Sequence, residues 1–249
     1  VPLNNFFYWA SMNDRGKLLF DLKTLPVDDL VFVVDAEVSE DELAWAYREF
    51  STGRSVVPRA YSSVKYRTDM VGDEREMDGD FYLPEEKTLK EIMDTGGICM
   101  HQAYFANHVA KAFGIPSIML SGSGRRGGHA WVVFLKDREE WDFESAGKYS
   151  QDRFPSGDAR HPHTGQTVTD RMVEFECQKF RRSEAYRKAL AQMETASLAL
   201  DLGFLDKALA IVRDAQKTEA RCYEAWLAEG AILEKTDPDK CAAFYDGMA

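Results

Sequence analysis

The sequence predicts an α+β fold in which a helix that begins at a cysteine packs against an antiparallel sheet, followed by an all-helical segment. Apolar residues recur at helical spacing over residues 99–113, and short apolar stretches separated by turn residues follow them. Beyond residue 174 the chain is rich in alanine and leucine and keeps a helical period. A helix, then strands, then helices alone is the order typical of an α+β domain joined to a helical one.

Local patterns predict the elements that precede the cysteine. Ser39 and Glu42 form a capping-box pattern ahead of apolar residues at helical spacing, which predicts a helix beginning at Ser39. Alternating valines and tyrosines over residues 55–67 favour an edge strand or an extended arm, and residues 70–80 form a predicted acidic loop. A proline in the first turn and a face of leucine, isoleucine and methionine predict a helix over residues 84–93.

The cysteine helix is expected over residues 97–113, because glycines precede it and Gly114 with Pro116 closes it. Its apolar stripe consists mostly of alanines, which allow close approach to a sheet. Strands and loops follow the helix. The strands are predicted at 117–120, 130–135 and 141–145, with loops at 121–128 and 147–165 and ordered structure again at 167–175.

The C-terminal part of the chain contains a weak internal repeat. Ala196 and Gly230, for example, are small residues 34 positions apart. Small residues at this spacing resemble tetratricopeptide repeats (TPR), which implies helical hairpins that bind a protein partner or pack on the rest of the chain. We therefore divide the sequence into three regions. They are an N-terminal extension (1–62), a mixed helix and strand domain (63–175) and TPR-like hairpins (176–249).

Composition narrows the classes of function. The net charge of −11 argues against a nucleic-acid partner, and no apolar run is long enough to span a membrane. The four cysteines are too scattered for a disulfide framework or for paired metal ligands, so we expect reduced thiols, which fit the cytoplasm, with no metal and no cofactor. The start at Val1 and the helical pattern still running near Ala249 suggest a piece of a longer protein.

Cys99 is the predicted nucleophile, because it stands where the helix begins. Unpaired backbone N–H groups and the positive end of the helix dipole stabilise negative charge on a sulfur at this position, and the thiolate is the form that attacks a carbonyl carbon. The preceding glycines let a substrate backbone approach, and the N–H of Cys99 is a natural oxyanion donor. The remaining cysteines, which lie in helical patterns, are expected to be structural. They are Cys177, Cys222 and Cys241.

His129 is the predicted base among five histidines. It follows a glycine-rich loop and shares a strand face with Trp131, so the ring is held while the loop admits a ligand. His101 and His108 project from other parts of the cysteine helix, and the remaining two histidines lie in a loop.

A third group that orients the imidazole would complete the site, and two carboxylates are candidates. Asp142 and Glu144 lie on one face of the strand that follows the turn. If a four-residue loop joins the two strands, His129 lies opposite Ala146 and Glu144 is its diagonal neighbour. Asp142 would then lie about 13 Å along the strand. We therefore prefer Glu144 and keep Asp142 in reserve.

The segments GICMHQA, AFGIPSIML and GHAW, followed by a tryptophan and a carboxylate, resemble the transglutaminase-like domain of papain-related thiol enzymes. The segment HTGQTVTDRM is similar to bacterial proteins with this domain. The resemblance implies a cysteine at a helix start, a histidine in an HAW-type strand, and an aspartate three or four residues after a tryptophan. Cys99 and His129 match this order. Trp141 places the third position at Glu144 or Ser145, so the expected aspartate is replaced.

The resemblance, which covers roughly residues 84–169, implies acyl transfer on a protein or peptide substrate through a thioester. Cys99 attacks an amide carbonyl, and His129 takes the thiol proton and returns one to the departing amine. Water as acceptor gives a cysteine protease or amidase, and an amine gives an acyltransferase. Trp131 walls the site or is buried in the core, and Gln102 lines it or is exposed. The alternative function is an inert scaffold that serves with the TPR-like helices as a protein-binding module.

Overall fold

The computed structural model describes residues 3–71, 83–124, 127–138, 140–148 and 157–247 of the chain. Contacts divide the chain into two compact units, residues 1–177 and 178–249. The described structure is 59% helical and contains one five-stranded antiparallel sheet, which confirms the predicted α+β class. Most of the acidic loop expected at residues 70–80 lies outside the described residues.

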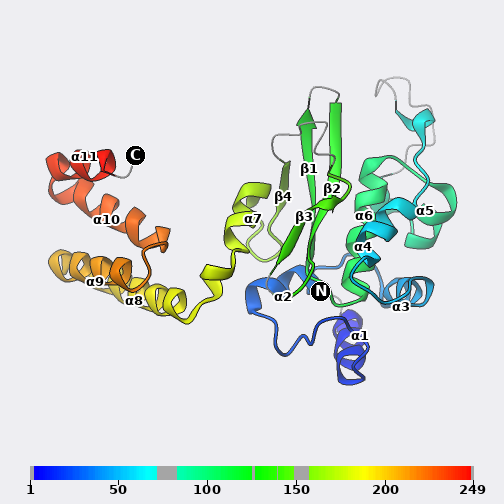
Figure 1. Cartoon of the computed structure of the whole chain (residues 1–249), viewed down its shortest axis with the longest axis horizontal. Helices are drawn as coiled ribbons and strands as arrows, with labels where there is room; N and C mark the ends of the chain where they lie inside the picture. Colours follow the sequence, from blue (N-terminus) through cyan, green and yellow to red (C-terminus); the bar gives the residue numbers. More distant parts are fainter. Residues whose placement is uncertain (1–2, 72–82, 125–126, 139, 149–156, 248–249) are drawn as a thin grey trace. The chain divides into compact units, whose positions relative to one another are not determined.

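The first unit runs from helices into the sheet and then into one more helix (Figure 1). Its helices are α1 (Leu3–Asp14), α2 (Val27–Val34), α3 (Glu40–Glu49), α4 (Val56–Ser63), α5 (Leu89–Thr95), α6 (Cys99–Ala112) and α7 (Asp170–Glu176), with 3₁₀ turns at Thr68–Met70 and Pro84–Glu86. Its strands are β1 (Ser117–Gly124), β2 (Gly127–Leu135), β3 (Trp141–Ala146), β4 (Gly157–Arg160) and β5 (Thr167–Thr169). The strand order is β3-β2-β1-β4-β5, so β3 and β5 are the edges.

The sheet extends further than the apolar pattern indicates. The ladder between β1 and β2 continues to Gly124 opposite Gly127, so the loop predicted at residues 121–128 is wrong. Glycine and serine present the same backbone donors and acceptors as other residues, and these groups complete the ladder without an apolar side chain. The loop predicted at residues 147–165 likewise contains β4, which pairs with β1. Residues 149–156 of that loop lie outside the described part of the chain.

The helix α6 is the centre of the first unit. Every residue from His101 to Ala112 is buried, which is the pattern of a helix enclosed on all sides rather than an amphipathic surface helix. One side of α6 packs on β1 and β2, and the helices α2 to α5 pack around the rest (Figure 1). The helix expected at residues 97–113 is present over the shorter range Cys99–Ala112, and the N-terminal extension contributes to the same core.

Two of the predicted elements before α6 are corrected by the structure. The segment expected to be extended forms α4, whose buried residues Val56, Val57, Ala60 and Tyr61 follow the spacing of one helix face. The helix expected over residues 84–93 begins later, because a 3₁₀ turn precedes Thr88, which caps α5 with its side chain. By contrast, α3 begins as predicted, and both reciprocal bonds of its capping box are formed.

The two faces of the sheet pack against different cores. On β2, Ala130, Val132 and Phe134 belong to the core that contains α6. Trp131 and Val133 belong to the second core, together with residues of α7 and Phe32 of α2. Successive side chains of a strand point to opposite faces, so α6 lies on one face and α7 on the other.

The second unit consists of antiparallel helical hairpins. Its helices are α8 (Glu184–Asp201), α9 (Leu205–Thr218), α10 (Tyr223–Thr236) and α11 (Pro238–Asp246), preceded by a 3₁₀ turn at Lys179–Arg182. Small residues such as Ala196 and Ala208 fill the contact between neighbouring helices, and the Tyr245 ring occupies the space that a Cβ at Gly230 would need. These contacts explain the small residues of the repeat. No helix in the described ranges is both long and apolar enough to span a bilayer.

Candidate active site

Cys99 is the first residue of α6, and the segment before it is hydrogen-bonded to the residues that follow α4. Gly97 donates its N–H to the Lys65 carbonyl at 3.0 Å and accepts from the N–H of Arg67 at 2.9 Å. Ile98, the N-cap residue, has an extended backbone and supplies no side-chain cap. The helix therefore begins at Cys99, with the backbone N–H groups of its first turn beside the thiol.

The four thiols differ in their access to solvent. Cys99 is half-buried, whereas Cys177, Cys222 and Cys241 are buried. Burial raises the pKa of the Cys222 thiol, because a thiolate loses its hydration in an apolar environment. Cys99 alone among the four combines a helix N-terminus with exposure, which is the environment of a reactive cysteine.

His129 is the third residue of β2 and is half-buried. Its Nε2 lies 2.6 Å from the carbonyl oxygen of Gly147, and its ring stacks against Trp131 with the centroids 6.0 Å apart. A carbonyl only accepts hydrogen bonds, so Nε2 must carry the proton. In the neutral ring Nδ1 is then the basic nitrogen.

Position 147, whose carbonyl binds the His129 ring, must be glycine for two reasons. Its φ of +95° lies in the region that side chains with a Cβ rarely adopt, and an added Cβ would overlap the ring of Tyr61. Tyr61 in turn donates its hydroxyl to the Ala130 carbonyl at 3.0 Å. Tyr61 belongs to the core around α6, so the carbonyl that binds His129 lies beside that core.

The topology brings Cys99 and His129 to the same end of the sheet. The Ser117 hydroxyl donates to Asn107 Oδ1 at 2.9 Å, which fixes α6 along β1. Cys99 lies eight residues before Asn107, about 12 Å along the helix. Ser121 lies four residues after Ser117, about 13 Å along the strand, and it pairs with the residue next to His129. Because the chain reverses direction between α6 and β1, both distances run from the Asn107–Ser117 contact toward the same end of the sheet.

The two side chains nevertheless lie on different faces of the sheet. The alternation along β2 gives His129 the face of Trp131, whereas α6 covers the face of Ala130. Within the described part of the chain, no hydrogen bond joins the Cys99 thiol to His129. The structure thus brings the predicted nucleophile and base to one end of β2 without pairing them.

The predicted register between β2 and β3 is wrong. Ala146 pairs with Val132 rather than with His129. Leu135 pairs with Trp141 rather than with Glu140, so the turn is one residue longer than predicted, and an irregularity between Val132 and Phe134 adds further residues to β3. The extra length comes from a turn around Asp142, whose Oδ1 accepts the N–H groups of Glu144 and Ser145 at 2.9 and 2.8 Å. The regular register assumed for this strand overlooks that an aspartate can bind the backbone N–H groups that follow it and so interrupt the ladder.

Neither candidate carboxylate contacts His129 in the described structure. Glu144 is exposed, and Asp142 is bound to its own strand, including the Ser145 hydroxyl at 2.8 Å. Partial burial raises the pKa of Asp142, but the hydrogen bonds from Ser145 and Glu144 outweigh it and hold the pKa below its usual value. The group seen to orient the ring is the Gly147 carbonyl, which residue type alone does not indicate.

The two predicted lining residues are both buried. Trp131 is fully buried in the second core, with Lys148 Nζ 5.7 Å from the ring centroid. Gln102 donates its side-chain amide to the Val64 carbonyl at 2.9 Å and so ties α6 to the end of α4. His101 is also buried, in contact distance of Gly97, where its ring leaves no room for a Cβ. These contacts give each of the three residues a structural role.

In the described ranges, no three His, Cys, Asp or Glu side chains come together in a way that could hold a metal ion. The expectation of a thiol site without a metal or cofactor stays a prediction. We compared the chain with protein-family models, with curated proteins and with solved structures, and none of them matches.

Proposed function

We propose that the first unit is a thiol enzyme that acts on amide bonds of a protein or peptide through a Cys99 thioester. The Cys99 sulfur forms a bond to the carbonyl carbon as the thiol proton passes to His129 Nδ1, and the imidazolium returns a proton to the departing amine as the C–N bond breaks. Water or a second amine then takes the acyl group from sulfur, which yields an acid or a new amide and restores the thiol.

The contrast in exposure among the thiols is the observation that carries this proposal. Cys99 is half-buried at the start of a helix with no side-chain cap, whereas the other three cysteines are buried. The N–H groups of the first helical turn would stabilise both the thiolate and the oxyanion that forms on the substrate carbonyl.

The state of His129 supports its role as the base. The Gly147 carbonyl selects the tautomer with the proton on Nε2, so Nδ1 is the nitrogen that would accept the thiol proton. A carbonyl carries no net charge and stabilises an imidazolium less than a carboxylate does. In this mechanism the His129 ring must reach Cys99 around the end of β2.

A protein-binding module is the second candidate, and two observations on His129 favour it. His129 lies on the face of the sheet opposite α6, and neither Asp142 nor Glu144 contacts it in the described structure. On this reading the first unit keeps the fold as a scaffold, and the helical hairpins supply the function.

Labelling with limiting iodoacetamide at neutral pH separates the two candidates. Exposure alone makes Cys99 the first thiol to react, so the deciding quantities are its rate relative to N-acetylcysteine and the dependence of that rate on His129. For an enzyme we expect Cys99 to react faster than the free thiol and His129→Ala to slow it by about tenfold or more. Mass spectrometry of peptides identifies the labelled cysteine.

The matched variants are Asp142→Asn and Glu144→Gln. We expect neither to slow the labelling of Cys99, because neither carboxylate touches the imidazole. A rate equal to that of the free thiol, unchanged in His129→Ala, would overturn the enzyme and favour the binding module. Circular dichroism of each variant checks that the fold is intact.

A further inference from the structure

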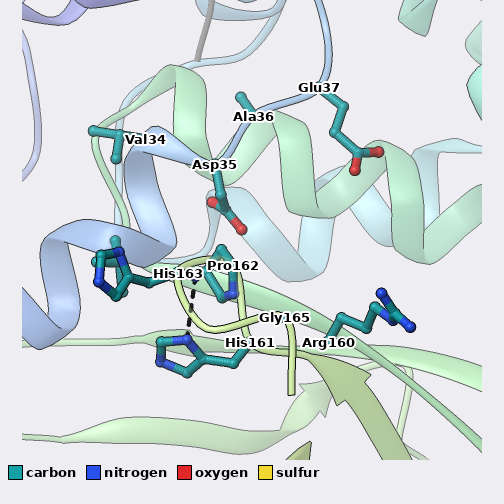
Figure 2. Close-up of a pocket in the computed structure, with 10 residues that line it drawn as sticks. Val34, Asp35, Ala36, Glu37, Arg160, His161, Pro162, His163 and Gly165 are labelled. Carbon is teal, nitrogen blue, oxygen red and sulfur yellow. Dashed lines mark hydrogen bonds between the residues drawn. The ribbon is translucent and has the colours of Figure 1, made fainter. Parts of the chain in front are cut away.

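A cavity of about 560 Å³ lies between the end of α2 and the turn that joins β4 to β5 (Figure 2). This volume is within the range of small-molecule sites in proteins. One wall is formed by the segment from Val31 to Glu37, and the other by the segment from Arg160 to Gly165. All of these residues belong to the first unit, so the cavity is complete within it.

The wall formed by residues 160–165, the strand-turn wall, presents hydrogen-bond donors. The Nδ1 of His161 accepts the backbone N–H groups of His163 and Thr164, each at 3.2 Å, so in the neutral ring the proton is on Nε2. The edge of the ring packs on Phe32, with the centroids 5.5 Å apart, and this contact holds its orientation. Arg160 and His163 are exposed, and no ion pair within the described ranges involves either residue.

The wall formed by residues 31–37, the helix wall, presents carboxylates. The Asp35 carboxylate points toward the opposite wall in Figure 2 and is held by Lys111 of α6, whose side chain is only 1% exposed. The backbone N–H of Glu37 donates to His108 Nε2 at 3.3 Å, which fixes the segment that carries it. The Glu37 side chain is exposed and takes part in no ion pair of the described chain. Since Lys111 balances Asp35, the unbalanced charges of the cavity are Glu37 and Arg160.

We propose that this cavity binds a small zwitterion of amino-acid or dipeptide size. The carboxylate of the ligand would bind Arg160, and its ammonium group would lie beside Glu37. A simple anion would face the Glu37 carboxylate and a simple cation would face the Arg160 guanidinium, so a ligand with both charges complements both walls. Its side chain would contact the apolar lining, which includes Val34.

This site is separate from the proposed catalytic cysteine. Lys111, which holds Asp35 at the cavity, lies twelve residues after Cys99, about 18 Å along α6. Binding here does not rest on the proposed function, and Cys99→Ser is expected to leave it unchanged. Failure of one proposal therefore does not imply failure of the other.

Isothermal titration calorimetry with alanyl-alanine tests the site. We expect saturable binding in the micromolar to millimolar range. N-acetyl-alanyl-alanine lacks the ammonium group and alanyl-alanine amide lacks the carboxylate, so each should bind at least about fivefold more weakly. Alanine, titrated in parallel, separates an amino-acid ligand from a dipeptide.

Two variants test the walls of the cavity. Arg160→Gln and Glu37→Gln change exposed side chains, and each should weaken alanyl-alanine by about fivefold or more. Arg187→Gln, on an exposed position of α8, is the matched control and should bind as the parent chain does. No saturable heat with any zwitterion, equal affinity for a blocked dipeptide, or normal binding by Arg160→Gln would overturn the proposal.

Discussion

The helices α6 and α9 are packed in two different ways. Every residue of α6 from His101 to Ala112 is buried, including several polar side chains. In α9 only Ala208, Val212 and Ala215 are buried, and the opposite side is polar. A hairpin helix of this kind is fixed by the size of the residues in one stripe, whereas an enclosed helix must also give each polar group a partner.

The polar residues of α6 have specific partners on other elements. Gln102 donates to the Val64 carbonyl, His108 accepts from the N–H of Glu37, and Lys111 pairs with Asp35. Loss of a partner leaves a polar group buried without compensation, which costs more than the loss of a few methyl groups. We therefore expect substitutions around α6 to have larger effects than similar ones in the second unit.

The largest effect is expected from Asp35→Ala, which leaves the Lys111 ammonium buried without its counter-charge. We expect a loss of about 3–5 kcal/mol in the free energy of unfolding, measured by urea denaturation. Arg213→Ala is the matched change in the second unit, where the Arg213 side chain is 49% exposed and Gln216 still binds Glu229. It should cost about 1 kcal/mol. Equal losses would contradict the distinction between the two helices.

The second effect is a pH dependence that originates at His108. Burial and then the charge of Lys111 lower the pKa of His108 to about 3, despite the hydrogen bond to the Tyr104 carbonyl. Between about pH 6.5 and 3 the unfolded chain binds this proton and the folded chain does not, so stability falls as the pH is lowered through this window. The contribution is up to about 1.4 kcal/mol per pH unit.

His108→Gln should remove this slope, and urea denaturation at several pH values measures it. Other groups titrate in the same window, so the comparison is the difference between variant and parent. His163→Gln, at an exposed position, should leave the slope as it is. A parent slope that survives in His108→Gln would show that the ring is not the group responsible.

The third comparison uses two glycines that both have positive φ. Gly147 has φ +95° and an added Cβ would overlap Tyr61, whereas Gly203, with φ +77°, has open space around it. We expect Gly147→Ala to cost more than about 2 kcal/mol, because backbone strain adds to displacement of a buried ring. Gly203→Ala should cost about 1 kcal/mol from the backbone alone. Similar losses in thermal or urea unfolding would mean that the Tyr61 contact is not rigid.

The smallest effects are expected within the second unit. Val212→Ala removes two buried methyl groups from the α9 stripe and should cost about 1.6 kcal/mol. Leu227→Ala, at a side chain that is 55% exposed, should change the free energy of unfolding by less than about 0.5 kcal/mol. A large loss for Leu227→Ala would reveal a contact that the structure does not contain.

The elements that sequence patterns predict well are those specified by local residues. The capping box at Ser39, the helix from Cys99 and the cores of β1, β2 and β3 all follow from local spacing. The prediction for residues 55–67 is wrong because the valines and tyrosines there suit a strand, whereas most of this segment packs against α6 as the helix α4. The strand β4 is missed because its residues, GDAR, carry no apolar pattern.

The candidate site likewise contains residues that local sequence patterns predict and contacts that they do not. Cys99 and His129 stand in recognisable sequence contexts, and the structure brings both to one end of β2. The Gly147 carbonyl leaves no trace in residue type, although a glycine after a strand indicates a turn with positive φ. The position of Glu144 rests on a regular register, and the bulge around Asp142 removes that regularity.

The turn around Asp142 also bears on how the molecule behaves at high concentration. β3 is an edge strand, and the exposed edge of a sheet can pair with a strand of another molecule. The Asp142 side chain already accepts the N–H groups of Glu144 and Ser145, and it adds a negative charge at the same place. Asp142, which does not contact the imidazole, thus binds backbone N–H groups that an incoming strand would need. We expect this to protect the β3 edge against edge-to-edge aggregation.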